Sequence, residues 1–250
     1  MGFGVPTYNF SDQVALGTVS GVIPVFKYGY NDEVGTSEEA IWSSGGAYTG
    51  FISAAEFVEV SSTSSSDAAA GVGLRQTMIF GLGYDLRAQH ETVTLNGLSA
   101  VTTKKRFFRV YRMTNTASGT NEKNVGTVSA VGATSGNKLA EMPAAYGQTE
   151  MCVYAVPLGS KAVLTGLLLE SDVAKLIDVR FNVAYIDPDT KLRRFAIGSR
   201  LGASGGVSNL DADPGVVVAG PADVWLSGIA ASGASNYASA QLVGKEYSIA

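Results

Sequence analysis

The sequence is poor in the residue types on which disulfide-bonded and metal-binding proteins depend. Its 250 residues include one cysteine and one histidine. A single cysteine cannot form a disulfide within the chain, and Cys152 lies in an apolar run, so we expect a buried thiol. The composition therefore excludes a disulfide framework, no cysteine and histidine spacing indicates a zinc site, and we expect no cofactor.

Charged residues are also scarce. Asp, Glu, Lys and Arg make up 16% of the chain, against roughly 25% in a typical globular protein, and the formal net charge is −4. So few charges indicate an exterior that is neutral or covered by partners. The negative balance predicts no direct binding to nucleic acid or to an anionic membrane surface.

Long apolar runs are absent too. No stretch approaches the roughly 18 consecutive apolar residues of a membrane span. The first ten residues lack the basic and apolar regions of a signal peptide. We therefore expect a protein assembled in the cytoplasm, without disulfides and outside any membrane.

The sequence is rich in short strand-like segments separated by turn residues, with 30 glycines. This pattern predicts an all-β fold: an antiparallel β-sandwich, jelly-roll-like, with long loops. Pro24 interrupts an early apolar segment and favours an edge strand or an extended arm. We expect an N-terminal arm over residues 1–40 and a sandwich over residues 41–250, with an alternative internal boundary near residues 132–148.

Two hairpins are predicted. Asn96-Gly97, between segments of alternating polarity, predicts a two-residue turn that pairs Leu95 with Leu98. Alternation over residues 173–185, followed by a turn and by residues 192–197, predicts a longer hairpin.

Three patterns suggest catalysis, and each lacks something that the chemistry needs. Glu38 and Glu39 are adjacent, and neighbouring side chains on an extended chain point to opposite sides. Ser204 lies in a Gly-Ala-Ser-Gly-Gly match to a nucleophile elbow, but residues 198–213 are expected to form a loop without the required strand and helix. His90 has no predicted nucleophile beside it. We therefore expect a protein that is not an enzyme.

Two kinds of binding site stay open. The aspartates Asp187 and Asp189, and Asp211 and Asp213, carry the oxygen ligands that calcium prefers, although neither pair fits an EF-hand loop. The aromatic residues Trp42, Tyr48 and Trp225 suggest, as an alternative function, a carbohydrate-binding β-sandwich.

The basic segment 106–113 is the predicted contact site. A strand here places apolar residues on both faces, so both faces must be covered. Arginine and aromatic residues are enriched in protein interfaces, which favours a subunit interface over nucleic-acid stacking. The predicted interface residues are Arg106, Phe107, Phe108, Arg109, Tyr111 and Arg112.

An ordered series of residues carries a family resemblance over positions 40–130, with a looser match at residues 154–159 and 221–225. The series runs Ile41-Trp42, Gly45-Gly46-x-Tyr48, Val60-Ser-Ser, Asp67-Ala-Ala, Gly71-x-Gly73-x-Arg75, Gly81-Leu, Tyr84, Glu91-x-Val93-x-Leu95-Asn96-Gly97, Phe107, Arg109-Val, Arg112-Met and Asn124-Val-Gly126-Thr. It resembles virion structural proteins of tailed bacteriophages, a type frequent in marine and freshwater phages.

The resemblance implies a component of the virion. We expect a protein that decorates or cements the capsid through subunit contacts, with the major capsid protein and other virion proteins as partners. A homo-oligomer, and specifically a trimer, is expected at local threefold positions. The alternative within the virion is a tail, fibre or receptor-binding component.

Overall fold

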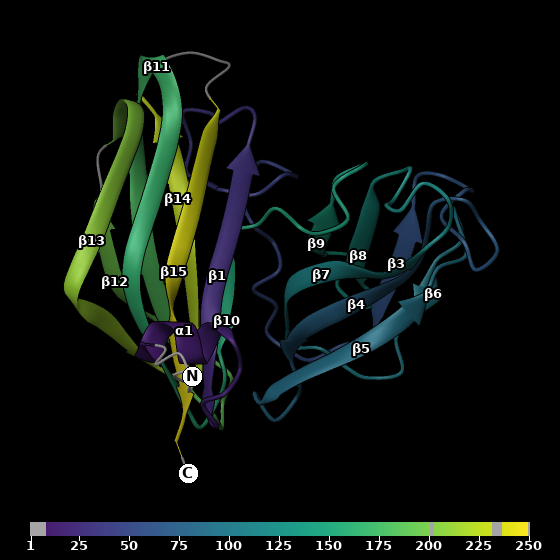
Figure 1. The fold of residues 1–250 in the computed structure, drawn as a ribbon, viewed down its shortest axis with the longest axis horizontal. Coiled ribbons are helices and arrows are strands. Elements are labelled where there is room, and N and C mark those ends of the chain that lie inside the picture. Colours follow the sequence, from purple (N-terminus) through teal and green to yellow (C-terminus); the bar gives the residue numbers. More distant parts are fainter. Residues whose placement is uncertain (1–8, 201–202, 232–236, 250) are drawn as a thin grey trace, which may run out of the picture.

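The computed structural model describes residues 9–200, 203–231 and 237–249, and nearly all its regular structure is strand (Figure 1). One short helix, α1 (Phe10–Ala15), precedes the strands. Their bounds are β1 (Val22–Asn31), β2 (Glu39–Ala40), β3 (Val58–Ser62), β4 (Leu74–Leu82), β5 (Ala88–Thr94), β6 (Val101–Thr102), β7 (Arg109–Ser118), β8 (Val128–Gly132), β9 (Lys138–Met142), β10 (Val153–Val156), β11 (Ser160–Ile186), β12 (Arg193–Arg200), β13 (Ala203–Ala219), β14 (Ala222–Ala230) and β15 (Ala238–Ser248). The described pairings between strands are antiparallel, so the predicted all-β fold is confirmed.

The 27-residue strand β11 organises the larger part of the molecule by doubling over on itself (Figure 1). Its first half pairs with β15 and β13, and its second half pairs with β14 and β12. Both ends meet at one turn: the amide of Gly220 donates to the carbonyl of Ser160, and the amide of Ile186 donates to the carbonyl of Pro221, each over 2.9 Å. One continuous hydrogen-bonded sheet therefore forms two packed layers.

These layers form the main sandwich, made of residues 22–42 and 151–248. The front layer in Figure 1 contains β1, β15, the first half of β11, and β13, and the back layer contains β12, the second half of β11, β14 and β10. Alternate residues of both layers point into a shared core, which includes Val25, Leu164, Val183 and Leu226. Burial of these side chains is the main driving force for packing the layers together.

A second, smaller unit interrupts the main sandwich between β2 and β10. This inserted sandwich, residues 43–150, packs the sheet β6-β3-β8-β9 against the sheet β5-β4-β7. Its core includes Val60, Ile79, Val110 and Met142. The chain leaves and re-enters the main sandwich at neighbouring points, because Trp42 and Met151 form an isolated antiparallel bridge.

Asp67, at the end of the serine run, organises the inserted sandwich from within. Its side chain is fully buried and accepts hydrogen bonds from the amides of Leu74, Val125 and Gly126 and from the hydroxyl of Ser62. A buried carboxylate is tolerated where several donors replace its water. The serine run is therefore a structural element, in which Asp67 joins the start of β4 to a segment 58 positions after Asp67 itself.

The domain prediction needs correction in two places. Residues 22–31 are not an arm, because they pair along their whole length with β15. As Pro24 suggested, β1 is an edge strand of the sheet. The remaining residues do not form one sandwich, and residues 132–148 are not a boundary, because β9 lies there inside the inserted sandwich.

The predicted hairpins had different outcomes. The long one is confirmed, since β11 pairs with β12 across the turn that begins at Asp187. At Asn96-Gly97 the turn is present, with Gly97 at a φ of 61°, but the strands on either side pair with different partners. Leu95 is 2% exposed and Leu98 66% exposed, so the two do not share a face. The loop expected over residues 198–213 is largely strand, with residues 201–202 outside the described part.

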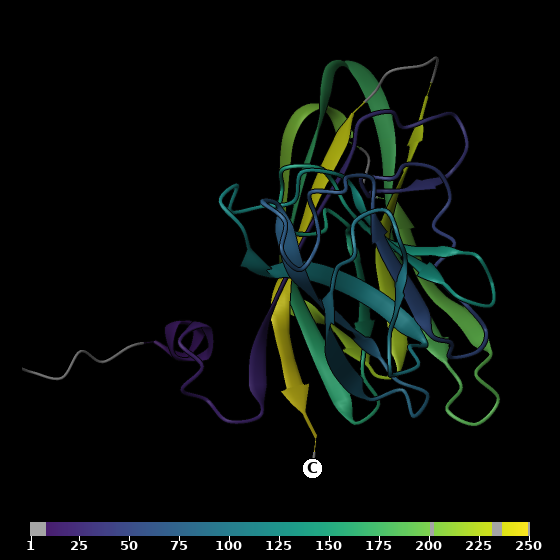
Figure 2. The same cartoon turned by 90° about the vertical axis from the view of Figure 1, so that its right-hand side faces the viewer.

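Helix α1 and the residues after it stand off the main sandwich (Figure 2). They project on the side of the front layer, and Phe10 and Leu16 are 49% and 59% exposed. An arm therefore exists, but it ends where β1 begins. In the described residues no helix has the length and apolar character needed to cross a membrane.

Candidate functional site

The junction between the two sandwiches contains a buried group of charges. Arg109 of β7 and Asp223 of β14 are 1% and 0% exposed. Two nitrogens of the guanidinium donate to the two carboxylate oxygens over 2.8 and 3.0 Å, and a third donates to the carbonyls of Ile52 and Phe108. Arg193 of β12 adds a second ion pair to Asp223 at 2.7 Å.

Aromatic rings enclose these charges. The guanidinium of Arg193 lies 3.8 Å from the ring centroid of Phe51 and 5.0 Å from that of Trp225. Burial is the largest cause of a lowered pKa for Arg193, and the opposing charge of Asp223 limits this effect. A bidentate pair whose remaining donors reach carbonyls is a well-satisfied buried ion pair. The group therefore joins the inserted sandwich to the main one.

This arrangement corrects part of the predicted interface. Phe107, Phe108 and Arg109 are at most 1% exposed inside the chain, so they cannot provide a contact between subunits. The expectation that both faces of this strand are covered is right, but the same chain provides the cover. Phe107 lies in the core of the inserted sandwich, and Arg109 lies against Asp223 of the main sandwich. Arg106 and Arg112 are exposed and Tyr111 is partly buried, and for these three an intermolecular role stays a prediction.

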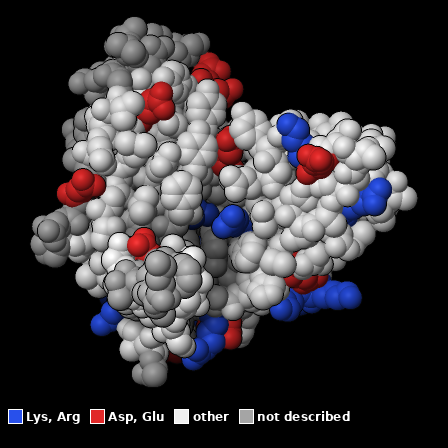
Figure 3. Space-filling model, in the orientation of Figure 1, with Lys and Arg blue, Asp and Glu red and all other residues white. Residues whose placement is uncertain are grey.

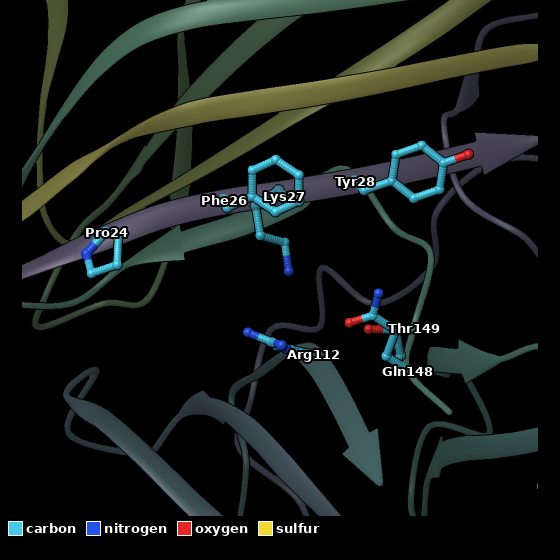
Figure 4. A pocket seen from close by; sticks show the side chains of 7 residues that line it. All are labelled: Pro24, Phe26, Lys27, Tyr28, Arg112, Gln148 and Thr149. Carbon is cyan, nitrogen blue, oxygen red and sulfur yellow. The ribbon is translucent and has the colours of Figure 1, made fainter. Parts of the chain in front are cut away.

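A groove lies between β1 and β7 (Figure 4). Its walls are formed by Pro24, Phe26, Lys27, Tyr28, Arg112, Gln148 and Thr149. Lys27 is only 6% exposed, and its ammonium donates to the backbone carbonyl of Tyr111. Figure 3 shows basic side chains in the hollow between the two sandwiches.

The electrostatics of Lys27 are unusual. Burial lowers the pKa of its ammonium from 10.5 to about 7, and the nearby charge of Arg112 acts in the same direction. Lys27 is not among the site residues predicted from the sequence. Its signal was the alternation of β1, which places Lys27 on the same inward face as Val25 and Gly29.

No sheet or loop in the described part of the chain packs over the outer face of the front layer. Cross-strand neighbours on it are largely uncharged: Phe26 lies opposite Val243, and Val217 lies opposite Val163. Phe26, Val243 and Val217 are 58%, 40% and 55% exposed. In Figure 3 this side of the molecule shows isolated charges on a mainly neutral surface.

The aromatic residues considered for carbohydrate binding are mostly internal. Trp42 is 3% exposed and its indole N–H donates to the carbonyl of Gly45. The hydroxyl of Tyr48 donates to the carbonyls of Val110 and Leu139. Trp225 is partly exposed but packs against Phe51 and Phe195. Trp42 and Tyr48 thus have no free face for stacking on a sugar.

The other candidate residues are separate in space or occupied. Glu38 pairs with Arg180, whereas Glu39 accepts from the amides of Gly35 and Gly46. His90 lies on β5 and is exposed. The side chain of Ser204 lies outside the described residues.

The proposed calcium ligands are likewise unassembled in the described part. Asp187 uses one carboxylate oxygen to accept from Asp189 and Thr190 of its own turn, and these bonds lower its pKa. The side chain of Asp213 lies outside the described residues, and Asp211 is exposed. No group of three or more potential metal ligands occurs among the side chains that the structure describes.

Comparison with known proteins yields only remote structural likeness. No family model and no curated protein matches the chain. A structure of the Gt strain of infectious bursal disease virus aligns with 97% of this chain and 82% of its own, at 10% identity and a TM-score of 0.22. The VP2 subviral particle of the same virus aligns with 96% and 82%, at 10% identity and a TM-score of 0.21. Likeness at this level supports no argument about fold or function.

Proposed function

We propose that this chain is a structural protein of a phage virion that decorates or cements the capsid through contacts between subunits. The observation that carries the proposal is the uncovered, largely uncharged outer face of the front layer, next to a projecting arm (Figures 2 and 3). The ordered series of residues that resembles phage virion proteins supports the same reading. The role is mechanical, and the proposal assigns the chain no catalysis and no cofactor.

The occupant of this face is a second copy of the chain. The arm begins beside the face, because Val22 pairs with Tyr247 at one end of β1. Phe10 and Leu16 of the arm are exposed, and the arm points away from its own sandwich. In the proposed oligomer the exposed apolar side chains of this arm contact the same face of a neighbour, and such exchanged contacts close into a symmetric oligomer. A trimer bound to the major capsid protein is the form proposed.

Position and copy number in the particle test the function. We expect cryo-electron microscopy of virions to place the chain on the capsid, and quantitative mass spectrometry to find it in high copy number. A low copy number at the tail would instead support the fibre or receptor-binding alternative. Absence from purified virions would refute both.

The oligomer is tested with charge placed on the face. We expect Val217→Asp combined with Val243→Asp to shift the mass from light scattering to that of a monomer, because each new carboxylate would have to be desolvated. Val72→Asp is the matched control, since Val72 is 48% exposed on the inserted sandwich. An oligomer unchanged by the double substitution, or a monomeric parent protein, would show that this face is not the contact.

A further inference from the structure

The groove between β1 and β7 holds two cations that face each other. In Figure 4 the ammonium of Lys27 and the guanidinium of Arg112 converge across the space between the two sandwiches. None of the described carboxylates lies within ion-pair distance of either group. Like charges that converge in a partly dry groove repel each other, and a negative group between them would reverse this effect.

Lys27 also has donors to spare. An ammonium has three N–H donors, and among the described residues this side chain makes one hydrogen bond, to the carbonyl of Tyr111. Lys27 is 6% exposed, and buried charges in proteins are normally paired. An acceptor in the groove would satisfy the remaining donors.

The groove has room for a small group and further donors to hold it. Its volume is about 180 Å³, which is enough for a small group. Gln148 and Thr149 line the side opposite β1. The hydroxyl oxygen of Thr149 accepts from the amide of Met113, which leaves its O–H available to donate.

From this geometry we propose that the groove binds one oxyanion group, a carboxylate or a phosphate, between Lys27 and Arg112. A planar carboxylate, or two oxygens of a phosphate, can accept from the fork of Arg112 while the ammonium contacts the same group. The volume suits a single such group, and the rest of a larger ligand would lie outside the groove. Phe26 and Tyr28, at the rim, lie where the carbon part of the ligand would pack.

The groups around Lys27 predict how binding depends on pH. Burial raises the pKa of Cys152, just before β10, and of Tyr111 on β7 to about 12, so both are neutral near pH 7. Arg112 is then the charged group that acts on Lys27 and lowers its pKa. The charge of Glu150 acts on Tyr28 and raises the pKa of that hydroxyl. Binding is expected to weaken as Lys27 loses its proton above pH 7.

The test is calorimetric titration of the full chain with inorganic phosphate and with glucuronate at pH 6.0, with glucose as the neutral control. We expect saturable binding of at least one anion and none of glucose. Lys27→Met and Arg112→Gln should each weaken binding at least tenfold, as expected for a lost charged hydrogen bond. Arg106→Gln is the matched control, because Arg106 is exposed and stacks on Phe57 in the same way as Arg112 stacks on Phe80.

The pattern of binding identifies the source of the oxyanion. Glucuronate alone would indicate a carboxylate ligand, and phosphate alone a phosphate ligand. The carboxylate of glucuronate stays ionised above pH 6, so a change in its affinity with pH reports the loss of the proton of Lys27. The affinity should fall about tenfold between pH 6.0 and 8.5 in the parent protein, and should not fall in Lys27→Met. Absence of saturable binding by either anion, or binding that survives both substitutions, would overturn the proposal.

Discussion

Replacing Lys27 by Met should stabilise the protein, and by an amount that depends on pH. The ammonium has an ordinary pKa of 10.5 in the unfolded chain and about 7 in the folded one. Folding therefore costs free energy whenever Lys27 must be held protonated and buried. A difference of about 3.5 pH units, at about 1.36 kcal/mol each, corresponds to a cost of about 5 kcal/mol below pH 7.

The direction of the pH dependence follows from the proton count. Between pH 7 and 10.5 the unfolded state binds the proton and the folded state does not, so the stability of the parent protein rises with pH. The cost is complete below pH 7 and fades toward pH 10.5. From pH 7 to 9 it shrinks by about 2 kcal/mol.

Met has a similar length and no charge, so the substitution removes this cost. It also leaves the carbonyl of Tyr111 without its donor, which costs about 1 kcal/mol. We therefore expect Lys27→Met to be more stable than the parent by about 3 kcal/mol at pH 7 and by about 1 kcal/mol at pH 9.

The assay is urea unfolding of both proteins across pH 6 to 9 at fixed ionic strength. The quantity of interest is the difference between the two free energies of unfolding, in which other titrating groups cancel. A difference that stays constant with pH, or a variant that is less stable at pH 7, would refute the assignment of Lys27 as a buried, destabilising cation.

Two further predictions concern buried carboxylates. Asp223→Asn should destabilise the protein by about 3–5 kcal/mol, because it leaves the guanidiniums of Arg109 and Arg193 without a counter-charge. Glu38→Gln, at the partly exposed pair with Arg180, should cost at most about 1 kcal/mol. Equal losses in chemical unfolding would contradict this. Asp67→Ala should cost about 4 kcal/mol, because it leaves buried amides unpaired, against less than about 1 kcal/mol for Asp85→Ala at an exposed turn. Hydrogen exchange should show the loss of protection concentrated in β4 and β8, and protection lost evenly over both sandwiches would argue against a local role.

Some of these features could be read from the sequence because they depend on neighbours in the chain. The alternation over residues 173–185 determines one buried face, and Asp187 closes the turn by accepting from the amides of the next residues, so the long hairpin is a local property. Pro24 cannot donate to a ladder, which placed β1 at an edge. The positive φ of Gly97 likewise follows from an Asn-Gly turn.

The tertiary structure alone decided which elements meet. An Asn-Gly turn does not determine which strands its flanks pair with, so β5 and β6 separate into different sheets. The apolar pattern around Arg109 shows that both faces of β7 are covered, but only the fold shows that Asp223, 114 positions away, provides the cover and the counter-charge. Lys27 and Arg112 meet for the same reason. Hydrophobic alternation determines which face of a strand is buried, whereas the partner across that face comes from segments distant in the sequence.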